Sequence, residues 1–183
     1  MLFKSTIKEH KLSTFQIVTA VVFAALCVVV TMAFVFPIGT TGGYFNLGDT
    51  VIYVAALLFG PLVGLIAGAG AAIADIVIAP GYAPITFIVK AVEGFLIGFL
   101  IKMLSSKIRN FTLCASIAVL VGGGEMVVGY FIYDSFVMGY AAALLLVPIN
   151  VAQMLLCLII AVPILHAVLR VFPRFKNYLR GVQ

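Results

Sequence analysis

The sequence predicts an all-α integral membrane protein: a bundle of six transmembrane helices with both termini in the cytoplasm. Three observations lead to this fold class: the composition, apolar runs of membrane-spanning length, and short basic clusters between those runs. Apolar residues make up 64% of the chain and charged residues only 9%, whereas charged residues are roughly 25% of an average soluble domain. So few charged side chains would not cover the exterior of a soluble fold, and we therefore expect that exterior to face lipid.

The apolar runs give the number of helices. The first, from about Phe15 to Phe36, has about 22 residues, and at about 1.5 Å per residue it is long enough to cross the hydrocarbon core. Glycine, proline and charged residues separate the later runs. These cover about Thr50 to Leu65, Leu65 to Ala79, Pro84 to Leu104, Phe111 to Tyr133 and Tyr140 to Phe172. The second and third runs are each short for a full crossing, and only the segment FGPLVG indicates a turn between them.

The basic residues predict the topology, because Lys and Arg concentrate in short loops on the cytoplasmic side of the membrane. An even number of crossings separates each basic cluster from the next, so all clusters fall on one side. The clusters are Lys4, Lys8 and Lys11; Lys102, Lys107 and Arg109; and Arg170, Arg174, Lys176 and Arg180. We therefore expect one membrane domain over residues 1–183, with a cytoplasmic N-terminal segment at 1–13 and a cytoplasmic tail at 173–183.

Lys90 is the exception to this charge rule. It lies near the outer end of the predicted fourth helix, and Glu93 follows on nearly the same helical face. Ionisable groups at membrane depth usually face a cavity and mark a substrate or ion route. The alternative is a structural ion pair that braces two helices.

Other polar residues gather in the same outer half of the predicted bundle. Those within the predicted helices are Asp75, Glu125, Asn150 and Gln153. This one-sided distribution indicates a pocket that opens outward, because a proton relay or channel needs polar steps through the full thickness. Residues of the outer loops are candidates to line or cover the pocket: Tyr44, Asn46, Asp49, Tyr82, Tyr130, Tyr133, Asp134 and Tyr140. The tyrosines are equally suited to anchoring at the membrane interface.

Small residues recur every fourth position in three places, and such stripes let helices approach closely. They are Gly60, Gly64, Gly68 and Ala72; Gly94 and Gly98; and Ala20 and Ala24. We expect the first two stripes to pack inside the monomer and the third, on the first helix, to face a partner. The run Gly122 to Gly124 either loosens the fifth helix or admits a neighbouring helix.

Motifs for catalysis are missing from the sequence. It contains no GxxxxGK[ST] phosphate loop, no HExxH and no GxSxG, and its two histidines, His10 and His166, lie near the predicted cytoplasmic side, remote from the acidic cluster of the outer half. The cysteines Cys27, Cys114 and Cys157 lie in apolar runs without metal-ligand spacing, so buried free thiols are expected. The sequence therefore predicts no catalytic residues, metal site, cofactor or nucleic-acid partner.

The segments GYFNLGDTVIYVAALLFGPLVGLIAGAGAAIADIV and YAPITFIVKAVEGFLIGFL together resemble the substrate-binding S components of energy-coupling factor (ECF) vitamin transporters. The likeness is strongest to the branch of hydroxymethylpyrimidine and pyridoxine carriers. It rests on NLGD, FGPLVG, the pair Ala74–Asp75 and KxxEG from Lys90, and it runs through all six predicted helices.

This resemblance implies a prokaryotic plasma-membrane subunit that captures a vitamin near the outer face. It also implies docking through Ala20 and Ala24 onto a membrane T component with two ATPase subunits. The implied substrate-binding set is Tyr44, Asn46, Asp49, Asp75, Tyr82, Lys90, Glu93, Glu125, Asn150 and Gln153. The S components for thiamin stack the vitamin on aromatic residues that include Trp, so the absence of Trp from this chain argues against thiamin as the ligand. Carriers of riboflavin or a queuosine precursor remain alternatives, as do a stand-alone membrane enzyme and a scaffold.

Overall fold

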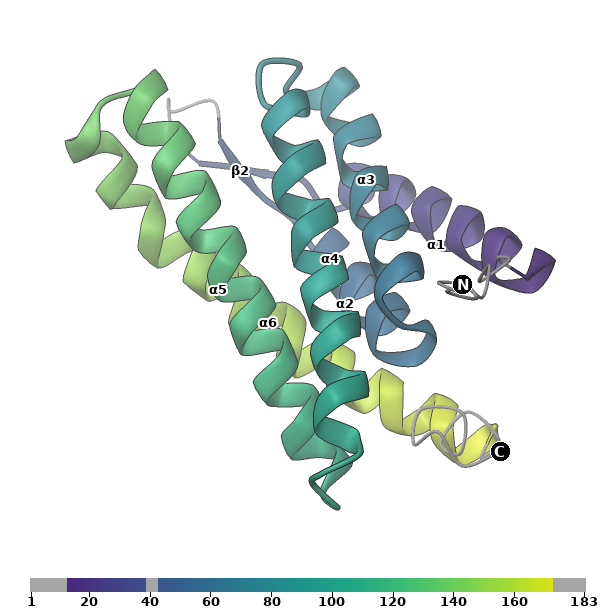
Figure 1. The fold of residues 1–183 in the computed structure, drawn as a ribbon. Coiled ribbons are helices and arrows are strands. Elements are labelled where there is room, and N and C mark those ends of the chain that lie inside the picture. The colour runs from purple at the N-terminus through teal and green to yellow at the C-terminus, as the bar shows by residue number, and fades with distance from the viewer. Residues whose placement is uncertain (1–12, 39–42, 173–183) are drawn as a thin grey trace, which may run out of the picture.

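The structure is a computed structural model that describes residues 13–38 and 43–172 (Figure 1). Within these residues the chain forms six helices and one two-stranded antiparallel ribbon, in which Phe36 pairs with Phe45. The predicted all-α membrane bundle is confirmed. The elements are α1 (Thr14–Ala33), β1 (Phe36–Pro37), β2 (Tyr44–Phe45), α2 (Gly48–Phe59), α3 (Pro61–Ile78), α4 (Ala83–Ser105), α5 (Phe111–Val137) and α6 (Tyr140–Val171).

Local sequence signals account for several helix ends. Ser13 and Gln16 form a capping box at the start of α1, and Asn110 caps α5 by accepting from the N–H of Leu113. The boundary between α2 and α3 is Gly60, whose φ of 91° favours glycine, followed by Pro61 at the first position of α3. The turn in FGPLVG is therefore real, but the prediction that α2 continues to Leu65 is wrong.

Five of the helices are long and apolar enough to cross a membrane, and α2 is not. With 12 residues, α2 is only about 18 Å long. It lies in the centre of the bundle, where it contacts α1, α3, α4 and α6, and every residue from Gly48 to Leu58 is buried. The ribbon precedes α2, and Asn46, two residues before the helix, is buried as well.

Two of the predicted small-residue stripes form the seam between α3 and α4. A Cβ atom on Gly68 would lie 1.9 Å from the carbonyl oxygen of Lys90, and one on Gly64 would lie 2.3 Å from that of Gly94. A Cβ on Gly98 would meet the backbone of Gly60 and Pro61. The two backbones are therefore in direct contact, which confirms packing inside the monomer.

The glycine run in α5 admits neighbouring helices. A Cβ on Gly122 would strike Ile97 of α4, and one on Gly123 would strike Met154 of α6. The helix itself is continuous from Phe111 to Val137. Close packing rather than a loosened helix is thus the role of this run.

The stripe on α1 packs inside the bundle as well. Ala20 is fully buried against Ala55, Val63 and Ala67, and the backbone of Ala24 lies where a side chain on Gly70 of α3 would have to be. The expectation that Ala20 and Ala24 form an exposed docking face does not match this packing. Helix α1 packs on α2 and α3 with Ala20 and Cys27 buried, while Val18, Val22 and Leu26 are exposed.

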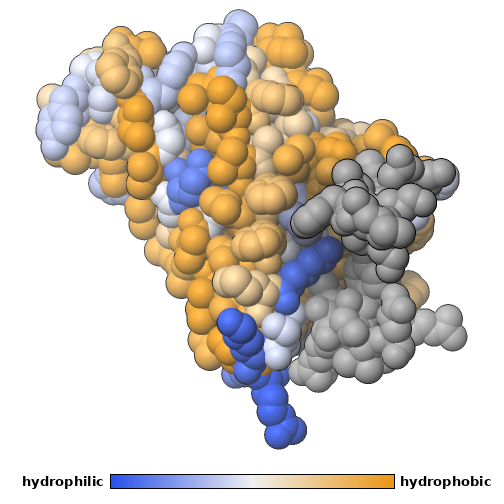
Figure 2. Space-filling view, viewed as in Figure 1, coloured by the Kyte–Doolittle hydropathy of each residue, from blue (hydrophilic) through white to orange (hydrophobic). Residues whose placement is uncertain are grey.

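The exterior agrees with a membrane environment. Figure 2 shows a mostly apolar surface along the helices, with strongly hydrophilic residues at the end where α4 meets α5. Lys102, Lys107 and Arg109 lie at that end and are exposed. Their cytoplasmic side, and that of both termini, remains a prediction from the charge rule. The other basic residues of the two terminal segments, 1–12 and 173–183, lie outside the described residues.

Candidate ligand-binding site

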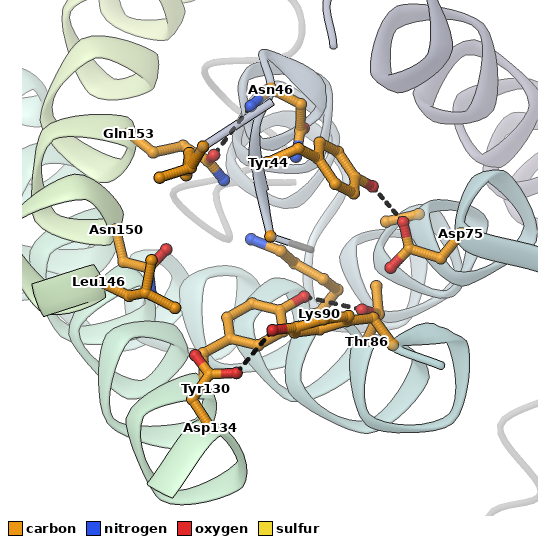
Figure 3. A pocket seen from close by; sticks show the side chains of 14 residues that line it. Tyr44, Asn46, Asp75, Thr86, Lys90, Tyr130, Asp134, Leu146, Asn150 and Gln153 are labelled. Carbon is orange, nitrogen blue, oxygen red and sulfur yellow. Dashed lines mark hydrogen bonds between the residues drawn. The ribbon is translucent and has the colours of Figure 1, made fainter. Parts of the chain in front are cut away.

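A cavity lies at the end of the bundle away from Lys102, Lys107 and Arg109, and Figure 3 shows the side chains that line it. Four helices and the ribbon contribute to its wall. The lining residues are Ile38, Gly43, Tyr44 and Asn46 from the ribbon region; Ala71 and Asp75 from α3; Tyr82, Thr86 and Lys90 from the start of α4; Tyr130 and Asp134 from α5; and Leu146, Asn150 and Gln153 from α6. Most of these side chains are polar or aromatic.

Helical spacing brings these side chains to one face of each helix. Tyr82, Thr86 and Lys90 follow each other at intervals of four residues, so they stack on the same side of α4. Tyr130 and Asp134 have the same spacing on α5. The cavity therefore lies where the polar faces of α3, α4, α5 and α6 converge.

Lys90, at the floor of the cavity, belongs to an ion-paired triad. The Lys90 ammonium lies 2.6 Å from Asp49 Oδ1 and 3.1 Å from Glu93 Oε2. All three residues are at most 2% exposed. Lys90 also lies 5.6 Å from the centre of the Tyr130 ring, within cation–π range. The triad joins α2 to α4, and Lys90 also lies in the lining of the cavity.

Further hydrogen bonds satisfy the triad. The Gln153 amide donates to Asp49 Oδ2 over 2.7 Å, and its oxygen accepts from the backbone N–H of Asn46 over 2.9 Å. The Tyr53 hydroxyl donates to Glu93 Oε1 over 3.1 Å. Each carboxylate oxygen of the triad therefore has a donor, which makes these buried charges tolerable.

Tyrosine hydroxyls bond to acceptors along the upper walls. Tyr44 donates to Asp75, and Tyr82 donates to Asp134 over 2.9 Å. The hydroxyls of Thr86 and Tyr130 lie 3.0 Å apart. Burial raises the pKa of Tyr44 and Tyr82, and the adjacent carboxylates raise it further. Both tyrosines therefore keep their protons at neutral pH and act as donors.

The structure divides the ten residues predicted to bind substrate into three groups. Those that line the cavity are Tyr44, Asn46, Asp75, Tyr82, Lys90, Asn150 and Gln153. Asp49 and Glu93 lie directly behind Lys90 rather than in the wall. Glu125, half-buried on α5, is not part of the lining.

The sequence interpretation placed Asp49 in an outer loop, and this position is wrong. Asp49 lies in the first turn of α2 and is 1% exposed, because segment 43–47 descends into the bundle before the helix begins. Tyr133 and Tyr140 also lie outside the lining: the Tyr133 hydroxyl donates to the carbonyl of Gly81, and Tyr140 is exposed.

Some lining residues were not expected from the sequence: Ile38, Gly43, Ala71, Thr86 and Leu146. A spacing signal was present for three of them. Ala71, Thr86 and Leu146 each lie one helical turn before a polar residue that was predicted, namely Asp75, Lys90 and Asn150. Extending each predicted position by four residues would have included them.

The model of a known protein family, the ECF-type riboflavin transporter S component, matches residues 11–170. The chain belongs to this family. The match extends through α1 to α5 and all but the last residue of α6. The S components of ECF transporters are substrate-binding membrane subunits, which agrees with the observed bundle and with the resemblance seen in the sequence. Neither the family description nor the fold assigns the chain to the pyridoxine and hydroxymethylpyrimidine branch.

An uncharacterised protein of Pyrococcus woesei, from a gap 3' region, is 39% identical over 103 residues. The aligned part covers 56% of this chain and 66% of that relative. The chain thus matches slightly less than two thirds of the curated relative, whose description names no ligand.

Proposed function

We propose that this chain is the substrate-binding subunit of an ECF-type importer for a small heteroaromatic vitamin or vitamin precursor. It captures the ligand in the cavity at the outer face and delivers it inward together with a membrane T component and two ATPase subunits. ATP hydrolysis takes place in those partners. The family supports the transport role, and the cavity supports the class of ligand.

The observation that carries the ligand class is the mixture of groups in the cavity wall. Tyr44, Tyr82 and Tyr130 offer aromatic surface, while Lys90 and Asn150 offer hydrogen-bond donors. Asp75 and Asp134 add acceptors for hydroxyl or amino groups. Pyridoxine and hydroxymethylpyrimidine combine a small heteroaromatic ring with such substituents, so they are the first candidates.

Riboflavin is the second candidate, because the matching family model describes riboflavin transporters. Its ribityl hydroxyls could bond to the same carboxylates, but its three-ring system is far larger than a single pyridine. Riboflavin therefore needs more space between the walls of the cavity than pyridoxine does.

Equilibrium binding to the purified full chain tests the proposal. We expect saturable binding of pyridoxine or hydroxymethylpyrimidine by calorimetry in detergent, and loss of that binding when Thr86 is replaced by a bulky residue (Thr86→Phe) that fills the cavity. The matched control is Thr112→Phe, since Thr112 lies on α5 beside His166 and outside the cavity.

The outcomes separate the function classes. Saturable binding of riboflavin alone would move the assignment to the second candidate. Conversion of a bound molecule by the chain without partners would indicate an enzyme, and the absence of any saturable ligand would favour a scaffold.

A further inference from the structure

The charges around the cavity are strongly unequal. Asp75 and Asp134 line its walls, and Asp49 and Glu93 lie behind its floor. Among the residues that the structure describes, Lys90 is the one basic residue in the lining. The sequence explains this imbalance, because it has no Lys or Arg between Lys11 and Lys90 or between Arg109 and Arg170. Four carboxyl groups therefore surround a single ammonium group.

Lys90 is poorly suited to hold an anion. Two of the three donors of its ammonium group point at Asp49 and Glu93, at 2.6 Å and 3.1 Å. Both carboxyl groups already pair with this ammonium group, so its remaining donor can meet an uncharged acceptor but leaves little positive field for an anion. A ligand phosphate would carry a charge of about −1.5 to −2 at neutral pH, and no arginine fork or free lysine stands in the wall to receive it.

Asp75 and Asp134 favour the opposite kind of ligand. The hydrogen bonds from Tyr44 and Tyr82 take one oxygen of each carboxylate, and a carboxylate has lone pairs for about four donors. Asp75 and Asp134 can therefore still accept hydrogen bonds from hydroxyl, amino or protonated ring-nitrogen groups of a ligand ring. Free vitamins carry such groups, and phosphorylation of a hydroxymethyl arm replaces one hydroxyl donor with an anionic ester that carries a charge of about −1.5 to −2.

We infer that the cavity selects its vitamin in an unphosphorylated, neutral or cationic form and rejects the phosphate ester of the same molecule. This inference rests on the proposed function and specifies the chemical class of its ligand. Specificity comes from repulsion as much as from attraction, because Asp75 and Asp134 act against an anion that would otherwise fit beside Tyr82.

Two matched ligand pairs test the inference on the full chain in detergent: pyridoxine against pyridoxine 5′-phosphate, and riboflavin against riboflavin 5′-phosphate. In the pair whose alcohol binds, we expect the ester to bind at least about 100-fold more weakly, the size expected when like charges are brought together. An ester that binds within about tenfold of its alcohol would overturn the inference and leave the proposed function intact. Binding by no member of either pair, together with no binding of hydroxymethylpyrimidine in a parallel titration, would overturn both.

Variants show whether the carboxylates cause the discrimination. Asp134→Asn keeps an acceptor for the Tyr82 hydroxyl but removes the charge, so we expect the ratio between alcohol and ester to fall about tenfold. Lys107→Gln removes an exposed charge at the opposite end of the bundle, outside the cavity lining, and is expected to leave the ratio unchanged. If the two variants change the ratio equally, the charge of Asp134 has no special role and the inference fails.

Discussion

The outer and inner parts of α4 form a direct comparison, because one continuous helix contacts the same neighbour, α3, along its length. Its outer part carries Thr86, Lys90 and Glu93, whose side chains bond to other helices around the cavity. Its inner part carries Gly94 and Gly98, where backbone meets backbone without any side chain between. The outer part is held by directional polar contacts and the inner part by close dispersion contacts.

This difference shows how the protein separates binding from assembly. Polar groups that leave space for a ligand need partners, or their burial would cost several kcal/mol each. Glycine contacts need no partners, but they tolerate no added atom. We therefore expect substitutions in the two parts to fail in different ways.

The largest effect is expected for Lys90→Met. This change leaves Asp49 and Glu93 as facing buried carboxylates, and removal of one partner from a buried ion pair typically costs about 3–5 kcal/mol. Thermal unfolding in detergent is the measurement. Lys107→Met removes an equal charge from an exposed position and serves as the control with no measurable change. A Lys90 variant as stable as the control would mean that the triad does not hold α2 to α4.

The second-largest loss of stability is expected for Gly68→Ala, in the seam between α3 and α4. Gly68→Ala places a methyl group against the carbonyl of Lys90, and overpacking of this kind costs about 1–3 kcal/mol. Gly124→Ala adds the same methyl group where no atom lies within 4 Å, and helix propensity makes it neutral or stabilising by about 0.5–1 kcal/mol. Equal unfolding temperatures for the two variants would contradict the close seam between α3 and α4.

A third substitution tests whether Ala20 of α1 packs inside the bundle. Ala20→Leu adds three carbon atoms to a fully buried position against Ala55, Val63 and Ala67, so the isolated protein is expected to lose about 1–3 kcal/mol of stability. Ala25→Leu on the exposed side of α1 is the control. An Ala20 variant that stays stable and binds ligand but fails in uptake would instead support the docking face expected from the sequence.

The smallest effect is expected in the cavity wall. Tyr44→Phe removes the hydroxyl that donates to Asp75 and keeps the ring. Since one hydrogen bond contributes about 0.5–1.5 kcal/mol, ligand affinity should fall by roughly 2- to 12-fold with little change in unfolding temperature. Tyr140→Phe, outside the cavity, should leave affinity unchanged. If both variants bind alike, the Tyr44 hydroxyl does not shape the site.

Hydropathy and charge were sufficient to predict the membrane bundle and to place the polar residues in one half of it. Both properties are sums over many residues, so single errors do not change the result. The seam between α3 and α4 was also predictable, because glycines four residues apart must share a helical face. Each of these properties is read from local stretches of sequence and does not depend on contacts between distant segments.

Contacts between distant segments were decided only by the tertiary structure. Asp49 is 41 positions from Lys90 and 104 from Gln153, and nothing local indicates that the chain descends into the bundle before α2 starts. Likewise, a stripe such as Ala20 and Ala24 states that something packs closely, but not whether the neighbour is α3 or another protein. Sequence periodicity defines the face of a helix, and the crossing of helices in space determines what that face meets.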